Sequence, residues 1–280
     1  MGRLLAYMGN DPQRVRCALH PGRDLLQSAD ARGAVDGWGL GFYQGGEVLL
    51  QRRPKPPATP IDFFELAKDL RTDAIIAHMR TGTHGTAKNE NTHPFRFRSW
   101  LFAHHGTIAG FDEHRAALLG AVPEHLARNI RGQTDSEFLF HLFLGNLHAA
   151  NRLDDPLLSP RAAGKALVEA MAQVTRVVGQ PSTLDVAATN GRILLVTRRG
   201  LPLSYYRVDG IRDCSVCRES PGEGRDGRPI DHDHLRAVVF LADGDAASQP
   251  RAPWAEVPED HMALVSHELG VEMIPLGLPG

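Results

Sequence analysis

The sequence predicts an α+β protein whose sheets are mostly antiparallel. Short apolar runs typical of strands fill the first third of the chain, helical periodicity dominates the middle, and strands joined by short turns return near the end. This order of strands, helices and hairpin-linked strands differs from the regular strand–helix alternation of a parallel sheet.

The first strands are indicated by apolar runs bounded by turn residues. RLLAYMG, at 3–9, ends in a glycine and is typical of a buried strand. In GWGLGFYQGGEVLLQRR, at 37–53, two β-rich runs flank Gly45-Gly46, which predicts a two-residue hairpin. Further strands are expected in DAIIAHMR at 73–80 and SWLFAHHG at 99–106.

Three helical segments follow these strands. The segment 111–130 carries Pro123, which should break or kink its helix. The segment 134–151 is a stronger helix, and 159–179 has a proline at its start and a glycine just past its end.

The last third of the chain returns to strands. In the segment 182–208, Asn190-Gly191 predicts a type I′ hairpin turn between two of them. The polar, Gly/Pro-rich stretch 220–234 predicts a mobile surface loop. The last strands are expected in 235–243 and 262–276.

The composition is that of an ordinary globular protein, with 42% apolar and 23% charged residues in 280. A net charge of -2 gives no basic footprint, so no nucleic-acid partner is expected. No apolar run reaches the roughly 18–20 residues of a membrane span. Three cysteines and no secretory signal favour a cytoplasmic location. We expect one domain over 1–280, with room for a small Cys/His loop insertion at 212–234.

Two glycine-rich stretches follow predicted strands and carry candidate polar residues. HMRTGTHGT places Arg80 at a strand end, where its guanidinium can hold a carboxylate in a bidentate manner; a surface arginine is the plain alternative. AHHGTIAGF ends a strand at His104, His105 and Gly106, and a glycine there lets the backbone present N–H groups to a developing oxyanion. A metal on the paired histidines lacks a second ligand pair at a recognised spacing.

The stretch GQTDSE predicts the start of a helix. Thr134 followed by Glu137 is a capping box, which accounts for both side chains. Asp135 is then free to meet a ligand's ammonium group at this end of the helix. In NTHPFRF, His93 precedes a proline, and a plain loop is the alternative to a site.

The order of these motifs resembles that of the class II glutamine amidotransferases, which are N-terminal-nucleophile hydrolases. The order is an N-terminal strand followed by DGWGLGFY, HMRTGT, NTHPF, FAHHGTI and TDSE. The stand-alone branch that includes the γ-glutamyl hydrolases of ergothioneine biosynthesis is the most similar. The resemblance covers nearly the whole chain, because AATNGRILLVTRRGLPLSYYR is similar to the family's late hairpin. It implies a four-layer αββα fold with two antiparallel sheets between helix layers.

The resemblance also implies a catalytic arrangement at the N-terminus. In the family, residue 2 is a cysteine exposed by methionine removal; its thiolate attacks the γ-amide of glutamine and its α-amino group is the base. Here that position is Gly2, which has no side chain. The family's oxyanion hole is an asparagine–glycine pair, which here reads His105-Gly106.

The residues that hold the amino-acid end of the substrate match the family. Arg80 corresponds to the arginine that binds the α-carboxylate, and Asp135 to the aspartate that binds the α-ammonium. Thr81 and His93 join them as candidate substrate-binding residues. The expected ligand is glutamine or a γ-glutamyl small molecule.

The missing nucleophile leads to three hypotheses. The first is a pseudoenzyme that binds such a ligand without cleaving it. The second is an active amidohydrolase, in which Gly2 replaces a native cysteine or water does the chemistry; rescue by Cys17 is remote, because that residue carries no α-amine. The third is a non-catalytic subunit that supports a protein partner.

The chemistry of the family requires no cofactor, but the chain offers a separate metal-like pattern. In CSVC, Cys214 and Cys217 have C-x-x-C spacing, and His232 and His234 follow. Two thiolates and two imidazoles suit a tetrahedral structural zinc, although H-x-H is tighter than the usual finger spacing. Reduced, unliganded cysteines are the alternative, and a redox pair lacks a thioredoxin-like context.

Overall fold

The computed structural model describes residues 2–26, 37–54, 62–80, 86–219, 230–243 and 252–279. Two sheets in which every pairing is antiparallel form its centre. The first, in the order β11-β9-β10-β1-β4-β2-β3, contains β1 (Arg3–Gly9), β2 (Gly37–Gln44), β3 (Glu47–Arg53), β4 (Ala74–Arg80), β9 (Leu203–Ile211), β10 (His232–Asp243) and β11 (Ala255–Glu256). The second, in the order β13-β12-β8-β7-β6-β5, contains β5 (Phe95–Phe97), β6 (Trp100–Thr107), β7 (Thr183–Thr189), β8 (Leu194–Arg198), β12 (His261–Val265) and β13 (Val271–Pro275).

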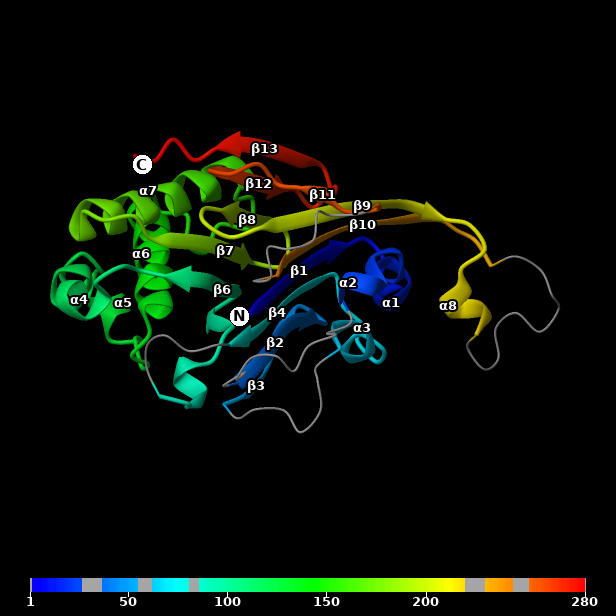
Figure 1. Ribbon diagram of the computed structural model, residues 1–280, viewed down its shortest axis with the longest axis horizontal. Coiled ribbons are helices and arrows are strands. Elements are labelled where there is room, and N and C mark those ends of the chain that lie inside the picture. Colours follow the sequence, from blue (N-terminus) through cyan, green and yellow to red (C-terminus); the bar gives the residue numbers. More distant parts are fainter. Residues whose placement is uncertain are drawn as a thin grey trace.

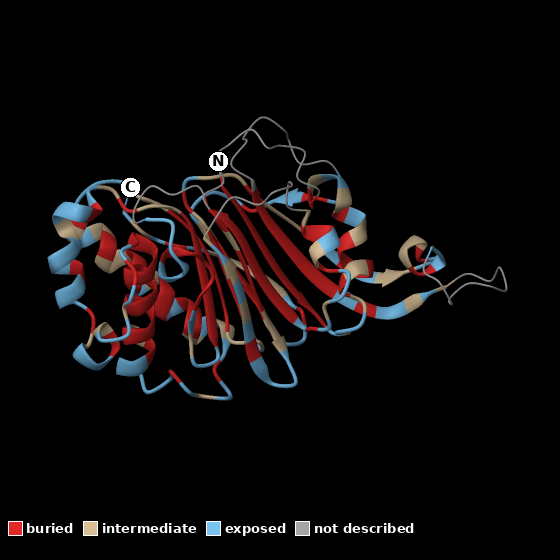
Figure 2. Ribbon diagram, turned by 90° about the horizontal axis from the view of Figure 1, so that it is seen from below, coloured by how far each residue is buried: buried red, intermediate tan, exposed pale blue. Residues whose placement is uncertain are grey.

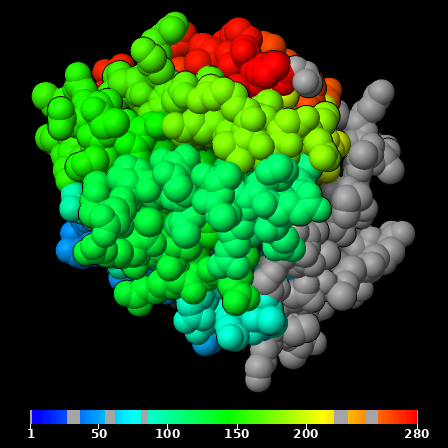
Figure 3. Space-filling model, turned by 90° about the vertical axis from the view of Figure 1, so that its left-hand side faces the viewer, coloured from blue at the N-terminus to red at the C-terminus, as the bar shows by residue number. Residues whose placement is uncertain are grey.

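Helices cover the outer faces of both sheets (Figure 1). The second sheet carries α4 (Phe111–Gly120), α5 (Glu124–Ala127), α6 (Asp135–Ala149) and α7 (Pro160–Val178), which form the green face of Figure 3. The first sheet carries short helices, namely α1 (Val15–Leu19), α2 (Arg23–Leu26), α3 (Phe63–Leu66) and α8 (Ser215–Arg218). The expected four-layer αββα arrangement is confirmed.

Three apolar clusters hold the layers together, and β1 shows how the sequence divides between them. All seven residues of β1 are buried. Leu5 and Tyr7 pack toward the short helices, whereas Leu4, Ala6 and Met8 pack between the sheets, because successive side chains of a strand point to opposite faces. Figure 2 shows that the strands at the centre are mostly buried and that helices lie outside them. The space between the sheets is therefore lined by alternate residues of the strands on either side.

The helix predictions agree with the structure. The first segment breaks as expected: α4 ends at Gly120 and α5 begins after Pro123. Ser159 caps α7 by accepting a hydrogen bond from the Ala162 N–H, and Gly179 closes it with φ of 65°. These ends follow the usual preference for a hydroxyl N-cap and a left-handed glycine C-cap.

Both predicted hairpins are present, but only the first has the predicted two-residue turn. Gly45 and Gly46 both have positive φ and join β2 to β3 as a two-residue turn. By contrast, β7 and β8 are joined by the four residues 190–193, because Thr189 pairs with Leu194. The Asn190 carboxamide oxygen accepts hydrogen bonds from the N–H groups of residues 192 and 193, so this asparagine folds an Asx-type loop.

The predicted surface loop 220–234 lies largely outside the described residues, at 220–229. Its last residues belong to a strand, since β10 begins at His232. In the described part of the chain, no helix has the length and apolar character needed to cross a membrane.

Candidate functional site

The site begins where the chain enters the central strand of the first sheet. β1 lies between β10 and β4, and Arg3 pairs with Met79, which puts Gly2 beside Arg80. A Cβ atom built on Gly2 would lie 2.5 Å from the Met79 carbonyl oxygen and 3.2 Å from Cε1 of His105. Gly2 therefore lies close to both sheets, and a side chain at this position would require a local shift.

Strand alternation turns three polar side chains into the space between the sheets. On β4, Ala74 and Ile76 pack there, and His78 and Arg80 continue the same face. On β6, Leu101 and Ala103 pack there, and His105 follows in the same alternation. We call Gly2, His78, Arg80, His93 and His105 the inter-sheet site.

The histidines of the inter-sheet site form a compact buried group. The ring centroids of His78 and His93 lie 4.4 Å apart, and those of His78 and His105 lie 5.7 Å apart. Among the described residues, neither ring nitrogen of His78 or His93, nor Nε2 of His105, has a hydrogen-bond partner. These buried nitrogens are the polar atoms that a ligand between the sheets would meet.

Burial keeps these imidazoles uncharged near neutral pH. Desolvation, followed by the charge of His104, lowers the pKa of His105 to about 4. Desolvation lowers the pKa of His78 and of His93 well below the usual value, and the Arg80 guanidinium adds to both shifts. Each neutral ring offers one N–H donor and one acceptor.

His93 enters the site on a loop that the surrounding structure fixes. Residues 89–91 form a short 3-10 turn before it, and the Asn91 carboxamide accepts a hydrogen bond from the Gln133 N–H at 2.8 Å. A Cβ on Gly39 would lie 2.0 Å from the His93 carbonyl oxygen, so only glycine lets β2 pass this loop. The sequence predicted His93 as a site residue, and the structure places it against His78.

The His105-Gly106 pair lies at the end of β6, against β7. A Cβ on Gly106 would lie 2.1 Å from the Thr183 carbonyl oxygen, which requires glycine at this position. His104 faces the opposite way: its Nδ1 lies 3.0 Å from Oγ of Ser136 and its Nε2 lies 2.8 Å from the Thr183 carbonyl oxygen. His104 thus joins the helix layer to the sheet, and His105 faces the inter-sheet space.

The sequence suggested that Asp135 is free to meet a ligand, but the structure shows that its carboxylate already has hydrogen-bond partners. Asp135 is 3% exposed, and its carboxylate accepts hydrogen bonds from the Ile108 N–H at 2.8 Å and from the N–H of the following serine at 2.8 Å. It therefore ties the start of α6 to the chain leaving β6. Because a carboxylate has about four acceptor positions, it retains capacity for a further donor.

The predicted capping box is confirmed on one side only. The Thr134 hydroxyl accepts a hydrogen bond from the Glu137 N–H at 3.3 Å. The Glu137 carboxylate accepts instead from the N–H groups of Arg131, at 3.0 Å, and Gly132, at 2.6 Å. Of the other predicted residues, Arg80 is 5% exposed at the end of β4, and Thr81 lies outside the described residues.

A second cluster lies on the outer side of the first sheet. The side chains of Cys17, Cys214, Cys217 and His232 bring four ligand atoms within 4.8 Å of one another, and this buried Cys3His cluster can hold a metal. It contains three of the four residues predicted from the sequence.

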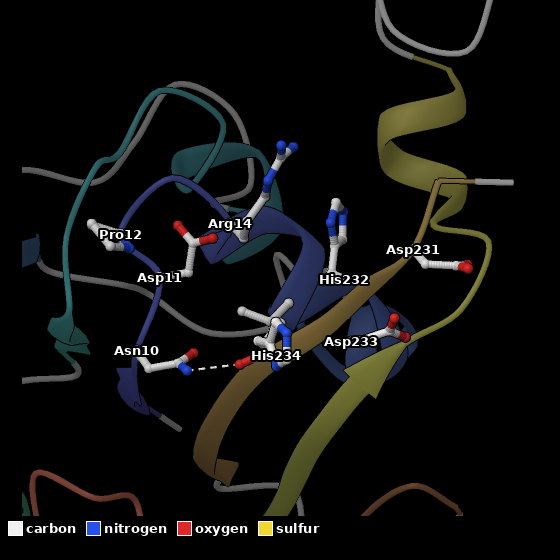
Figure 4. Close-up of a pocket in the computed structure, with 9 residues that line it drawn as sticks. Asn10, Asp11, Pro12, Arg14, Asp231, His232, Asp233 and His234 are labelled. Atoms are coloured by element: carbon white, nitrogen blue, oxygen red, sulfur yellow. Dashed lines mark hydrogen bonds between the residues drawn. The ribbon is translucent and has the colours of Figure 1, made fainter. Parts of the chain in front are cut away.

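His234 is outside the Cys3His cluster and exposed. The β9–β10 pairing shifts register between His232 and Arg236, so alternation along the strand breaks down and the two histidines separate. The backbone of His234 is bound instead by Asn10, whose side-chain N–H donates to the His234 carbonyl oxygen at 2.7 Å (Figure 4).

From the sequence, Cys17 was considered only as a substitute nucleophile and not as a metal ligand, and His78 was not named. Cys17 is about 200 positions from its partners, and only the count of three cysteines and one buried histidine could have indicated it. His78 precedes Arg80 by two positions, and that spacing on a strand was the available sign that both face the same side.

The comparisons with known proteins agree with this geometry. The family model described as glutamine amidotransferases class-II matches residues 1–208. A "Probable glutamine amidotransferase DUG3" of Saccharomyces cerevisiae is 26% identical over 96% of this chain and 82% of its own length. A "Gamma-glutamyl-hercynylcysteine sulfoxide hydrolase" of Mycobacterium tuberculosis is 29% identical over 63% of this chain and 65% of its own length.

Solved structures share the fold. A glutamine aminotransferase class-II domain protein from Silicibacter pomeroyi superposes with a TM-score of 0.57 at 22% identity, over 98% of this chain and 99% of the other. The glutamine phosphoribosylpyrophosphate amidotransferase of B. subtilis gives a TM-score of 0.54 at 13% identity, over 99% of this chain and 50% of the other. By its matched sequence, this chain belongs to the class-II glutamine amidotransferase family.

Proposed function

We propose that the chain binds glutamine or a γ-glutamyl compound in the inter-sheet site and does not hydrolyse it. The observation that carries this proposal is the environment of Gly2. The residue next to His105 and the Met79 carbonyl has no side chain, so it offers no nucleophile. All three cysteines of the chain lie in the Cys3His cluster, so no thiol replaces the missing one.

Recognition of the amino-acid end rests on two buried charges. Arg80 is buried at the end of β4, beside the start of the chain, and its planar guanidinium suits the α-carboxylate. Asp135 would accept a hydrogen bond from the α-ammonium with the acceptor positions that its backbone contacts leave open. Thr81 and His93 complete the proposed binding set.

The side-chain amide of the ligand would then point toward His105 and Gly106. A neutral His105 can donate one N–H to the amide oxygen, and the close packing of Gly106 against β7 fixes the backbone beside it. Without a thiolate, no acyl intermediate forms on the protein, and these groups bind the amide without cleaving it. The names of the yeast and mycobacterial relatives support glutamine and γ-glutamyl amides as the ligand class.

The test combines binding and turnover on the unmodified protein. We expect calorimetry to detect binding of glutamine or of a γ-glutamyl thiol compound to the protein. We expect ammonia release from either ligand to stay at background. Arg80→Ala should weaken binding by roughly 30-fold or more, because truncating one member of a buried charge pair costs about 2–5 kcal/mol. Arg128→Ala, at an exposed site on the helix side, is the matched control and should bind as the parent does.

Two results would overturn the proposal. Ammonia release well above background would make the protein an active amidohydrolase, and its sensitivity to a thiol-alkylating reagent would show that one of the three cysteines takes part. No binding at millimolar ligand would mean that the site has lost recognition, and a non-catalytic role beside a protein partner would replace the proposal.

A further inference from the structure

The strongest unexplained feature of the molecule is the Cys3His cluster, which lies apart from the inter-sheet site. Its four side chains come from three segments: Cys17 from α1, Cys214 and Cys217 from the N-terminal end and body of α8, and His232 from the start of β10. The three cysteines are buried and form no disulfide bond, and the histidine is half-buried. Three segments far apart in sequence thus converge on one point.

The distances within the cluster match those of a tetrahedral metal site. Sγ of Cys17 lies 3.5 Å from Sγ of Cys217, and Sγ of Cys217 lies 3.3 Å from Nε2 of His232. Around a zinc ion with bonds of about 2.3 Å to sulfur and 2.0–2.1 Å to nitrogen, ideal tetrahedral geometry separates two sulfurs by about 3.8 Å and sulfur from nitrogen by about 3.5 Å. The two observed separations are therefore within about 0.3 Å of the tetrahedral values, and all four ligand atoms lie within 4.8 Å of one another.

The surroundings of the sulfurs also fit a metal better than a plain apolar core. The Arg14 guanidinium donates to Sγ of Cys217 at 3.0 Å. Three thiolates and one Zn²⁺ carry a net charge of -1, which a neighbouring guanidinium offsets, whereas a neutral thiol is only a weak acceptor. Buried cysteines that merely fill space need neither this cation nor an imidazole.

An open pocket reaches one side of the cluster. Arg14 and His232 both line it, together with residues 10–12 and 233–235 (Figure 4). Because His232 lies at this border and is the half-buried member, the pocket gives an ion an entry path. All four positions are protein ligands, which is the arrangement of a structural rather than a catalytic zinc.

We propose that this chain binds one structural Zn²⁺ through Cys17, Cys214, Cys217 and His232. The ion would join α8 and the start of β10 to α1, across about 200 residues of sequence. Two contacts already hold these segments together: the Cys214 N–H donates to the Ile230 carbonyl oxygen at 2.8 Å, and Oγ of Ser215 lies 3.2 Å from Nε2 of His20. Three of the four ligands lie beyond residues 1–208, the part of the chain that the family model matches.

The first test is metal content. Protein purified without chelator should contain about one zinc per chain, and after metal removal, Co²⁺ added alone should give the visible absorption of tetrahedral cobalt–thiolate coordination. Cys17→Ser and Cys217→Ser should both lose most of the metal. His234→Ala is the matched control, since it changes the neighbouring histidine outside the cluster, and it should keep full zinc content.

The Cys17→Ser variant separates this site from the two-cysteine, two-histidine set that the sequence suggests. If it keeps full zinc and His234→Ala loses it, the ligand set is wrong. If the parent binds neither zinc nor cobalt, and mass spectrometry finds three free thiols or a disulfide, the proposal is overturned. Both cobalt titration and thiol counting use the unmodified chain, so an unstable variant does not prevent the decision. Neither result depends on glutamine binding.

Discussion

The inter-sheet site and the Cys3His cluster bury chemically active side chains on opposite faces of the first sheet. The two differ in whether these side chains already have polar partners. In the inter-sheet site, three histidines are buried with ring nitrogens that lack partners among the described residues. In the Cys3His cluster, sulfur and imidazole atoms lie against one another and against a guanidinium. The first arrangement leaves polar atoms for a ligand, and the second already has the ligand set of an ion.

The difference also concerns where the chain keeps its thiols. Gly2 lies beside His105 and the Met79 carbonyl and has no side chain, whereas the outer cluster holds all three cysteines. A thiol surrounded by other sulfurs and a cation serves metal binding, while a lone thiol beside an amine serves nucleophilic attack. Under the two proposals made above, the two regions divide ligand recognition from metal binding within one fold.

The largest expected effect tests whether the inter-sheet site lacks only its thiol. With the initiator methionine removed, Gly2→Cys should release ammonia from glutamine at a low rate, because Cβ must first move away from the Met79 carbonyl. Adding His105→Asn should raise that rate further, because an amide is the family's donor at this position, but by less than the roughly 10²–10³-fold that a wholly absent donor costs. Ammonia release by each variant is the measurement.

The single variant His105→Asn is the control and should stay at background, since it has no nucleophile. A double variant that remains inactive while glutamine still binds would show that more than these two positions has changed. Equal rates for the single and double cysteine variants would mean that His105 already supplies the donor.

The second effect tests how tightly β6 packs against β7 beside the inter-sheet site. Gly106→Ala puts a Cβ 2.1 Å from the Thr183 carbonyl oxygen, and backbone on both sides resists the shift. We expect a loss of about 3 kcal/mol in the free energy of unfolding, near the upper end for an overpacked site. Denaturant unfolding measures it. In Gly120→Ala, at the end of α4, the new Cβ meets nothing within 4 Å, so that control should unfold at or above the parent's midpoint.

The third effect uses the protonation of His105. The pKa of His105 is about 4 in the folded chain and about 6.5 when unfolded, so the unfolded state binds the extra proton between these values. The resulting stability is present above pH 6.5 and is lost as the pH falls toward 4. Lowering the pH from 7.5 to 5 should therefore cost the parent about 2 kcal/mol more than His105→Asn.

Unfolding free energies of both proteins at the two pH values measure this difference. His234→Asn is the control, because it removes an exposed imidazole that lies outside the inter-sheet site. An identical pH dependence in the parent and in His105→Asn would mean that His105 takes up its proton in the folded state, as a solvated histidine does.

The sequence predicted the layers well because they follow from local patterns. Alternation, caps and the break at Pro123 act over a few residues, and the structure keeps them. The positions of Arg80 and His93 followed from matching motifs. The structure adds what motifs omit: the carboxylate of Asp135 is already occupied by backbone N–H groups.

The turn at Asn190 was predicted wrongly for a local reason, whereas the other errors occurred where contacts between distant segments decide the outcome. Asn190 forms a longer loop because its own side chain accepts two backbone N–H groups. Cys17 joins Cys217 only because α1 and α8 pack together, and no local pattern contains that contact. His234 was chosen for its nearness in sequence, and a register shift in β10 separates it from His232.

The smallest expected effect concerns the cation of the outer cluster and rests on the zinc proposal. Arg14 donates to the Cys217 sulfur, whereas Arg16, also half-buried and near the same short helix, pairs with Glu65. Partners of metal ligands typically change metal affinity by 10–100-fold when removed. Because the guanidinium reaches one sulfur of the four ligands, we expect Arg14→Met to weaken zinc binding about tenfold, measured by competition with a chelating dye.

Arg16→Met is the matched control. It removes the same charge two residues further along the chain, but the contact between Arg14 and the Cys217 sulfur stays in place. It should leave zinc affinity within about twofold of the parent, because a solvated charge that does not touch a ligand is screened. Equal weakening by both variants would show that net positive charge near α1, rather than the contact between Arg14 and Cys217, stabilises the thiolates. No weakening by either would mean that the Cys217 thiolate needs no compensating cation. The comparison between the two regions would then rest on the ligand set of the outer cluster alone.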